Sequence, residues 1–505
     1  MNILVILGHP RKDSFCGALA NKYMEGCLQA GHTINFLPLS DLNFDVDVQT
    51  VHPQDQEVEP DLEHAKILIS EADHIAVFYP TWWGSMPAVL KGFWDRVFVP
   101  GFAFREINLG NYEKYLTGKS AELFINLDTP VFVYKYFMGA PGTKSVKNNT
   151  LKFCGIEPVR TTHFSPINHS TAEQRNKWLQ KCFEKGIKAE KVHNDPLHQF
   201  MQKIAPWVQA IRFQFYPMTF IAYWAGALLS RQISGDWNWL AFIIGYVILF
   251  LIENYTVFTN ELYDQKTDEA NENFGPFSGG SRVLVSNKLS GKQLKRGAGI
   301  TAALITLLSI LLYFSSPASA LILTAYVGIT WFLGHAYTVP PFKFSYRTLG
   351  EITVGITHSF CVLLGGFLIQ LGHLYNKEVW WLAVPLFISI LPSITLSGIP
   401  DRRADQMANK KTIAVRLGVT NSIKFVMFIT AIAVIVPIIL YHTILQQQLS
   451  WAVYLVIPHG IFLIYKLREY LQLKEKPERI DELMVYSLLL MVWYGIIPVI
   501  RLLQG

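Results

Sequence analysis

Two different patterns of hydrophobic and polar positions divide the chain near residue 206. Up to about residue 195, short apolar runs alternate with segments of helical periodicity, and charged residues occur at the density usual in soluble domains. Beyond Pro206 the apolar runs become long and short polar loops separate them. A helix needs roughly 20 apolar residues to cross a bilayer. We therefore predict a soluble module at 1–192, a linker at 193–205 and a membrane module at 206–505.

The soluble module contains five short apolar runs that we interpret as strands. They lie at residues 2–7, 32–37, 73–79, 120–126 and 158–164, and helical patterns separate them. The runs at 2–7 and 73–79 are almost entirely apolar, which is typical of parallel strands covered on both faces. This alternation predicts an α/β flavodoxin-like doubly wound parallel sheet, whose ligand would lie at the carboxyl ends of the strands.

The membrane module contains nine apolar runs, which begin near residues 208, 238, 297, 317, 350, 379, 422, 450 and 484. They predict an all-α polytopic bundle of about nine transmembrane helices. The loops after the second, fourth, sixth and eighth runs hold 18 Lys and Arg, whereas the alternate loops hold only Arg231 and Lys377. Because basic loops stay in the cytoplasm, we expect these loops and the soluble module on the cytoplasmic face of a bacterial cell membrane. The C-terminus would face the other side.

Composition narrows the range of partners. The 505 residues carry a formal net charge of +6, and the basic excess lies mainly in membrane-proximal loops. Membrane topology explains it better than nucleic-acid binding, so the lipid bilayer is an expected partner and nucleic acid is not. The five cysteines are scattered without paired spacing, which predicts neither disulfides nor a zinc site. No signal-peptide pattern precedes the first strand.

Two sets of polar residues with a spacing of four follow the second and sixth apolar runs. The sets are Asn260, Asp264 and Asp268, and Asp401, Asp405 and Asn409. Residues four apart share one face of a helix. Mg²⁺ binds one or two carboxylates and leaves its other positions for water and substrate phosphates. Either set alone could be a solvated helix end, but the matched pair predicts a Mg²⁺-dependent site for a diphosphate.

These two sets and their flanking segments resemble the UbiA superfamily of intramembrane prenyltransferases over residues 206–505. The flanks are SGGSRVLV at 278–285, YTVPPFKFSYRTLGE at 337–351 and KKTIAVRLG at 410–418. The resemblance implies a prenyl diphosphate substrate and a Mg²⁺ site formed by Asn260, Asp264, Asp268, Asp401 and Asp405. Glu261 departs from the Asp more usual in that family.

The resemblance also implies basic residues around the diphosphate. The candidates are Lys343, Arg347, Lys411 and Arg212, although a single Lys or Arg in such a loop is also a common topology or lipid contact. Tyr337 is a candidate for stabilising an allylic cation through its ring face, with a membrane-interface anchor as the alternative. The four aspartates and Tyr337 are therefore the expected catalytic residues. Diphosphate departure would leave carbocation character on the allylic carbon, which an electron-rich acceptor attacks.

Three loops of the soluble module carry candidate flavin contacts. The loop after the first strand leads into a helix N-terminus, where amides and a hydroxyl suit a phosphate. The loop after the third strand holds two tryptophans that could lie along an isoalloxazine ring, with core packing as the alternative. The candidates are His9, Ser14, Phe15 and Cys16 after the first strand, Pro80, Thr81, Trp82, Trp83 and Gly84 after the third, and Asp128, Thr129 and Pro130 after the fourth.

This module resembles the flavin-dependent NAD(P)H:quinone oxidoreductases over residues 1 to about 190. The resemblance lies in HPRKDSFCGAL at 9–19 and YPTWWGSMPAVLKGFWDRVFVPGFAF at 79–104. It implies FMN or FAD as cofactor, NAD(P)H as hydride donor and a homodimer through this module. Cys16 stands where that family often has Asn. No Tyr and His pair is evident after the fourth strand, so Tyr134 and Tyr136 are placeholders for the hydride site.

The two modules together suggest one coupled reaction. A hydroquinone is electron-rich at ring carbon, whereas the quinone is not. We expect the flavin module to reduce a quinone with NAD(P)H and the membrane module to prenylate the hydroquinone, as in the biosynthesis of a menaquinone-type quinone. Two alternatives stay open: prenylation of an electron-rich aromatic acid beside an independent reductase, and a flavin-regulated transport or sensor protein.

Overall fold

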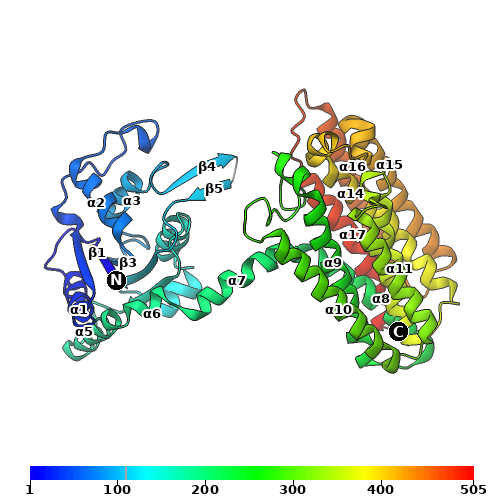
Figure 1. Cartoon of the computed structure of the whole chain (residues 1–505), viewed down its shortest axis with the longest axis horizontal. Helices are drawn as coiled ribbons and strands as arrows, with labels where there is room; N and C mark the ends of the chain where they lie inside the picture. Colours follow the sequence, from blue (N-terminus) through cyan, green and yellow to red (C-terminus); the bar gives the residue numbers. More distant parts are fainter. Residues whose placement is uncertain (109–110, 505) are drawn as a thin grey trace. The chain divides into compact units, whose positions relative to one another are not determined.

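The computed structural model describes residues 1–108 and 111–504, which form two compact units, Met1–Gln202 and Lys203–Gly505. The boundary between the units lies inside the predicted linker at 193–205. Most of that segment is helical, because α6 (Ala189–His193) ends there and α7 (Pro196–Ile211) begins there. Figure 1 shows the helices and strands of both units.

The first unit contains a five-stranded parallel sheet among its described residues, in the order β2-β1-β3-β6-β7. The strands are β1 (Asn2–Leu7), β2 (Thr33–Pro38), β3 (His74–Pro80), β6 (Ser120–Asn126) and β7 (Val159–Phe164). Each lies within one residue of its predicted range, and the strand order is that of flavodoxin-like sheets. The predicted α/β fold class is therefore confirmed. A short antiparallel pair, β4 (Phe104–Asn108) and β5 (Asn111–Lys114), was not predicted.

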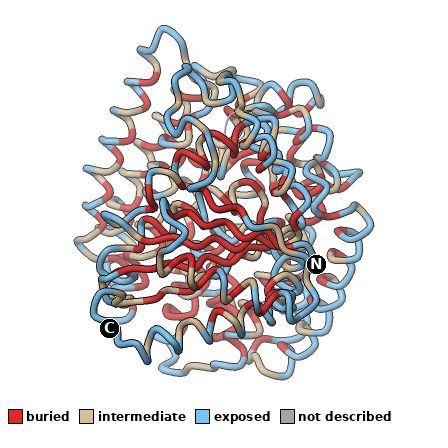
Figure 2. The backbone as a smooth tube through the Cα atoms, turned by 90° about the vertical axis from the view of Figure 1, so that its left-hand side faces the viewer, coloured by how far each residue is buried: buried red, intermediate tan, exposed pale blue. Residues whose placement is uncertain are grey.

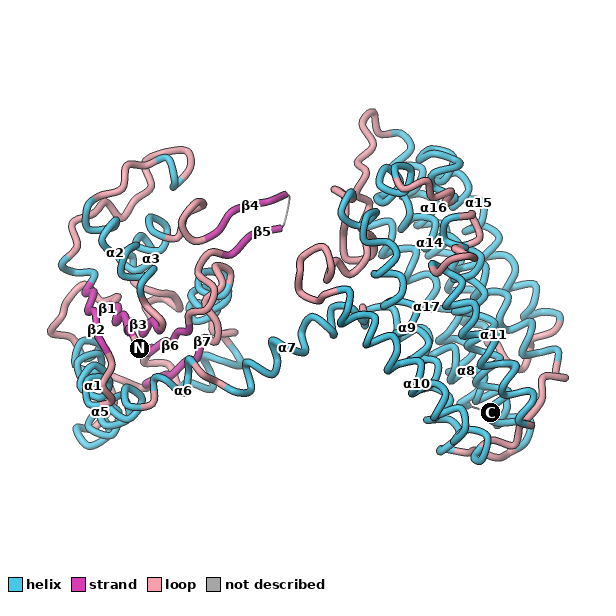
Figure 3. Tube along the Cα trace, in the orientation of Figure 1, coloured by secondary structure: helices cyan, strands magenta, loops and turns pink. Residues whose placement is uncertain are grey.

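Helices cover both faces of this sheet (Figure 3). They are α1 (Phe15–Gln29), α2 (Pro60–Glu71), α3 (Ala88–Val97), α4 (Pro141–Lys144) and α5 (Ala172–Ile187). Leu4 and Ile6 of β1 pack in the same cluster as α2 and α3, whereas Ile3 and Val5 pack with α1 and α5. Successive strand residues point to opposite faces. The sheet is consequently a continuous buried band (Figure 2), which explains the unbroken apolar runs.

The second unit is helical throughout its described regular elements. Its long helices are α8 (Tyr216–Ser234), α9 (Trp239–Ala270), α10 (Gly291–Ser315), α11 (Ala320–Thr338), α12 (Gly350–Ile356) continuing through the π-helical turn η7 (Thr357–Cys361) into α13 (Val362–Leu371), α14 (Lys377–Met407), α15 (Ile413–Thr443), α16 (Val456–Gln472) and α17 (Asp481–Gln504). The predicted polytopic bundle is confirmed. Among the described residues, seven helical segments are long and apolar enough to cross a membrane, and α8 and α16 are not among them.

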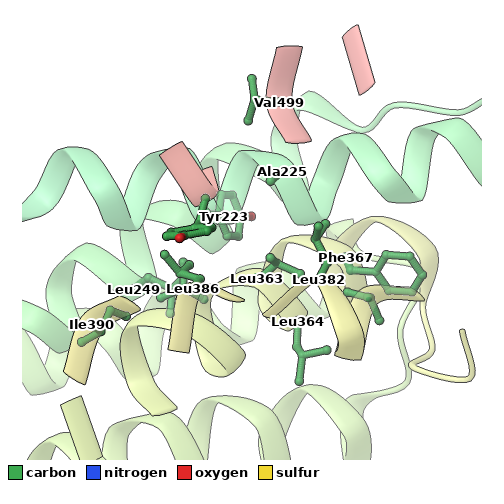
Figure 4. Packing of buried hydrophobic residues seen from close by; sticks show 14 of the residues in the cluster. Tyr223, Ala225, Leu249, Leu363, Leu364, Phe367, Leu382, Leu386, Ile390 and Val499 are labelled. Atoms are coloured by element: carbon green, nitrogen blue, oxygen red, sulfur yellow. The ribbon is translucent and has the colours of Figure 1, made fainter. Parts of the chain in front are cut away.

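Close contact between α8 and α13 fixes the centre of the bundle. A side chain added at Gly226 would meet the Leu363 carbonyl oxygen at 1.9 Å, and one at Gly366 would meet the Tyr223 carbonyl oxygen at 2.0 Å. Small residues of this kind let helix backbones approach where hydrophobic attraction between helices is weak. The side chains of Tyr223, Leu363 and Phe367 pack around this contact (Figure 4).

Candidate functional site

A cavity of about 370 Å³ in the second unit brings the two predicted acidic sets together. Asn260, Asp264 and Asp268 line it from the C-terminal part of α9, and Asp401 and Asp405 line it from that of α14. All five predicted metal residues therefore face one space. Asn409 is not among the lining residues described, because α14 ends at Met407 and Asn409 adopts a left-handed backbone conformation.

Asp264 lies at the centre of a polar network. Its carboxylate accepts hydrogen bonds from Asn260 Nδ2 at 2.9 Å and from the Tyr346 hydroxyl at 2.8 Å, and Lys410 Nζ lies 2.9 Å from its Oδ2. Lys410 Nζ also lies 3.4 Å from Asp405 Oδ1. Burial disfavours the ammonium, but the two carboxylates outweigh burial and raise the pKa of Lys410 above its ordinary value. The ammonium group of Lys410 thus links the two acidic sets.

The remaining carboxylates are held differently. Asp401 accepts hydrogen bonds from Asn271 Nδ2 at 2.8 Å and from the Gly279 amide at 3.2 Å. Asp268 is buried, and its Oδ2 has no hydrogen-bond partner among the described residues. A side chain at Gly280 would meet that oxygen at 2.3 Å, so only glycine lets the loop approach so closely.

These residues suit a hard divalent cation. Within the part of the chain that the structure describes, no three Asp, Glu, His or Cys side chains form a group that could hold a metal ion. Mg²⁺ does not require such a group, because it commonly takes one or two carboxylates and completes its shell with water and substrate phosphates. The unpartnered oxygen of Asp268 in a cavity lined by three further aspartates fits that chemistry.

The predicted diphosphate ligands lie in different places. Arg212 lines the cavity, and one of its terminal nitrogens has no hydrogen-bond partner among the described residues; burial lowers its pKa, although Asp401 and Asp268 oppose the shift. Lys343, Arg347 and Lys411 are not among the described lining residues. Lys343 lies over the Tyr346 ring, Arg347 donates to the Pro341 carbonyl at 2.9 Å, and Lys411 is exposed.

Lys410 and Tyr346 were missed by sequence reasoning, which selected the neighbouring Lys411. After α14 ends, the left-handed Asn409 turns the chain back, and the Lys410 amide donates to the Asp405 carbonyl at 2.9 Å. This turn directs Lys410 rather than Lys411 to the carboxylates. Tyr337, which was predicted, lines the cavity from α11.

The candidate flavin loops meet at the carboxyl ends of β1, β3 and β6. Ser14 caps α1, and its hydroxyl accepts a hydrogen bond from the Gly17 amide at 3.2 Å. The His9 ring packs edge-on against Trp82 with centroids 5.7 Å apart. Trp82 is 47% exposed and Trp83 fully exposed, so neither belongs to the core. The two tryptophans are therefore free to contact a ligand.

Other candidates in these loops are already engaged. Cys16 is buried, and its sulfur accepts a hydrogen bond from Asn126 Nδ2 at 3.1 Å; burial raises its pKa above the ordinary thiol value. The Asp128 carboxylate accepts hydrogen bonds from the amide and the side chain of Asn168, both at 2.7 Å. The Ser165 hydroxyl donates to the Thr129 carbonyl at 2.6 Å. These contacts fix the loop after β6.

The structure also supplies a tyrosine and histidine pair that the sequence did not reveal. The buried Tyr134 hydroxyl accepts a hydrogen bond from the Thr143 amide at 3.1 Å, and the Thr143 hydroxyl lies 3.1 Å from His163 Nε2. Burial lowers the pKa of His163 to about 4. Tyr136, the other placeholder, is 82% exposed. The pair was hidden because His163 comes from β7, a separate strand.

Replacing the cap of α1 is expected to weaken flavin binding. Ser14→Ala removes the capping bond and a hydroxyl from the predicted phosphate site, and should lower stability by about 1 kcal/mol. Thr171→Ala is a matched control, because Thr171 caps α5 in the same way. Titration of the full-length protein with flavin should show weaker binding in Ser14→Ala only. Equal flavin affinity in both variants would exclude this phosphate site.

Fold and site together define a membrane enzyme with an α/β unit and a helical unit that carries an aspartate-lined cavity. Residues 218–489, more than half of the chain, match the UbiA prenyltransferase family, and the chain belongs to that family. Residues 1–185 match the family of flavodoxin-like fold, which makes this unit a flavodoxin-like NAD(P)H:quinone oxidoreductase domain. The predicted fusion is confirmed.

Relatives of each unit are known separately. An uncharacterized NAD(P)H oxidoreductase of Haemophilus influenzae is 30% identical, over 37% of this chain and 94% of the relative. A ribosyldihydronicotinamide dehydrogenase [quinone] of Mus musculus is 26% identical, over 40% of this chain and 98% of the relative. A 2-carboxy-1,4-naphthoquinone phytyltransferase of Synechocystis is 25% identical, over 54% of this chain and 85% of the relative.

Proposed function

We propose that this protein reduces a quinone to its hydroquinone with NAD(P)H and then transfers a prenyl group from a prenyl diphosphate to the hydroquinone ring. The observation that carries the proposal is the convergence of both acidic sets on one cavity, in a chain that also contains a quinone-oxidoreductase domain. Prenylation needs an electron-rich ring, and reduction provides one. The name of the Synechocystis relative supports a naphthoquinone as the acceptor.

The residues of the cavity suit the departure of diphosphate. Asn260, Asp264, Asp268, Asp401 and Asp405 would hold Mg²⁺, which neutralises charge on the departing diphosphate when it is bound. Lys410 and Arg212 provide fixed positive charge beside the same carboxylates. Negative charge grows on the diphosphate as its bond to the prenyl group breaks. The positive charges of Lys410 and Arg212 therefore stabilise the transition state more than the intact prenyl diphosphate. Lys343, Arg347 and Lys411 remain proposed diphosphate contacts, from loops outside the described cavity lining.

The rest of the cavity suits the organic substrates. Leu249, Leu386 and Ile390 line it and belong to the packed core of the bundle (Figure 4). Such a wall accommodates an isoprenoid chain and excludes water, which would otherwise capture an allylic cation. The ring of Tyr337 lines the same space and provides a π face for that cation.

In the first unit, FMN or FAD would lie against Ser14, Trp82 and Trp83, and a bound flavin passes two electrons from NAD(P)H to the quinone.

We propose that a homodimer forms through this unit. We also propose that the first unit and the aspartate-bearing helix ends lie on the cytoplasmic side of a bacterial membrane. The concentration of basic residues in the loops beside those helix ends supports this orientation.

The coupling predicts a strict requirement for reductant. The full-length protein is given oxidised naphthoquinone, prenyl diphosphate and Mg²⁺ without oxygen, with or without NAD(P)H, and the product is identified by its mass. We expect product only with NAD(P)H, and chemically reduced quinone should restore product without it. Equal product from oxidised quinone in both reactions would exclude the coupling.

A carboxylated naphthoquinol is the second candidate acceptor, because the Synechocystis relative is named for a 2-carboxy compound. The same assay, run once with the reduced naphthoquinone and once with the reduced carboxylated compound, shows which of the two acceptors is prenylated. Product from an aromatic acid that needs no reduction, at the same rate with and without NAD(P)H, would indicate two independent activities instead.

A further inference from the structure

A carboxylate and an imidazole line the membrane cavity apart from the aspartates. Glu253 belongs to α9 and His358 to the π-helical turn η7, and His358 Nε2 lies 3.6 Å from Glu253 Oε1. The Thr219 hydroxyl of α8 donates a hydrogen bond to the same oxygen. Three separate elements therefore place polar groups at one point of the wall.

Apolar residues flank Glu253 on α9, whereas Thr357 adds a hydroxyl 3.0 Å from His358 Nδ1. Leu249, Ile252 and Val257 line the cavity beside Glu253 on the same helix. The side chains of Glu253 and His358 are 16% and 35% exposed, and both border the cavity. Ionisable residues within membrane helices are expensive to bury and generally mark substrate or ion pathways. In the described residues, Glu253 Oε2 makes no hydrogen bond with the protein, so it is available to a ligand.

The backbone at His358 supports a functional position. The helix from Gly350 to Leu371 is interrupted by the π-helical turn Thr357–Cys361, and such turns are frequent at functional sites. His358 Nδ1 lies 3.2 Å from the Val354 carbonyl, which can only accept a hydrogen bond from it. Nε2 faces Glu253 Oε1, and a proton on Nε2 would stabilise the ionised carboxylate.

Spacing along α9 relates this pair to the diphosphate site. Glu253 and Asp264 are eleven residues apart, which is about three turns and about 16 Å along the helix axis, on nearly the same face. This separation leaves room for three groups in a row between Asp264 and Glu253. They are the metal-bound diphosphate, the allylic carbon attached to it and one aromatic ring. A ring placed to attack that carbon would direct a hydroxyl toward Glu253.

We propose that Glu253, supported by His358, binds a ring hydroxyl of the aromatic acceptor and accepts its proton. This inference rests on the proposed prenyl transfer. The acceptor O–H bond breaks, its proton passes to Glu253 Oε2, and its electrons enter the ring. The ring carbon bonds to the allylic carbon as the C–O bond to diphosphate breaks, and that electron pair leaves with diphosphate. The ring carbon then loses its proton to the departing diphosphate, and Glu253 returns its proton to the ring oxygen, so the net products are the prenylated hydroquinone and protonated diphosphate.

The test compares Glu253→Gln with the wild type, using chemically reduced naphthoquinone, geranylgeranyl diphosphate and Mg²⁺. Glutamine keeps the size of the side chain and an acceptor for Thr219, but it cannot take a proton. We expect kcat to fall about 10²-fold or more, with unchanged KM for the prenyl diphosphate. Phenolic acceptors of lower hydroxyl pKa should recover most of the lost rate, because they ionise without a base. A purely structural role would give no such recovery.

Control variants keep the result interpretable. Glu378→Gln makes the same chemical change on α14 outside the described cavity lining and should leave kcat unchanged. His358→Gln should lower kcat less than Glu253→Gln, and it provides a second probe if Glu253→Gln does not fold. Wild-type rates in both variants, or a lost rate that acidic phenols do not recover, would overturn the inference while leaving prenyl transfer intact. No product from the wild type with reduced acceptor would overturn the proposed function itself.

Discussion

Replacing Asp264 by asparagine is expected to abolish prenyl transfer and to leave quinone reduction unchanged. Asp264 is the one carboxylate in the described network that contacts Asn260, Tyr346 and Lys410 together. The substitution removes the negative charge that balances Lys410 and removes one proposed Mg²⁺ ligand. Loss of one preorganised charged contact lowers kcat by roughly 10²-fold to 10³-fold, and loss of metal would lower it further.

The measurement has two separate parts. Prenyl transfer is followed by product mass with chemically reduced quinone, so that the first unit is not needed. Quinone reduction is followed by oxidation of NAD(P)H in the same preparation. Asp236→Asn is the matched control, because Asp236 is exposed in the loop after α8. Normal prenyl transfer by Asp264→Asn would favour the transport or sensor alternative.

Replacing Lys410 by methionine is expected to destabilise the second unit and to weaken binding of prenyl diphosphate. The substitution leaves Asp264 and Asp405 buried without their shared cation. Removing one partner of a buried ion pair costs roughly 3–5 kcal/mol. Lys411→Met is a close control, since the adjacent side chain is exposed. This pair of variants also decides between the lysine selected from sequence and the lysine that the structure places beside the carboxylates.

The Lys410 side chain stays charged throughout the neutral pH range. Its pKa in the folded protein lies above the unfolded value of about 10.4. A group with a raised pKa contributes its full stabilisation below the unfolded pKa and loses it only as the pH rises through the folded value. Thermal unfolding of wild type and Lys410→Met should differ less at about pH 6 than at about pH 9, because the buried carboxylates left without Lys410 bind protons as the pH falls. Equal melting temperatures of Lys410→Met and Lys411→Met would contradict the assigned ion pair. Added Mg²⁺ should narrow the difference in melting temperature between wild type and Lys410→Met, because it supplies the missing positive charge.

Much of the architecture could be predicted because its signals are local. Alternation and length of apolar runs located every strand of the parallel sheet to within one residue and separated the soluble unit from the membrane unit. The spacing of four within 260–268 and 401–405 placed each acidic set on one helix face, and both sets line the cavity. The predicted count of about nine spans is approximate, because α8 and α16 do not reach the length and apolar character of the other seven helical segments.

Residues brought together from distant segments could not be predicted in this way. Lys410 reaches the carboxylates only because the chain reverses after α14, and Tyr346 reaches Asp264 from a loop 82 residues away. Thr143 links His163 of β7 to Tyr134 of a separate helical turn, and Glu253 meets His358 across two helices. No periodicity in the sequence encodes these pairs.

Hydrophobic periodicity and side-chain spacing act within a single element, so they were enough to predict the two units, their secondary structure and the acidic faces of two helices. Which charges neutralise one another, and where a second polar pair lines the membrane cavity, became evident only from the folded arrangement of the helices. Those outcomes depend on the packing of separate helices and strands, which sets distances that neighbouring residues in the sequence do not fix.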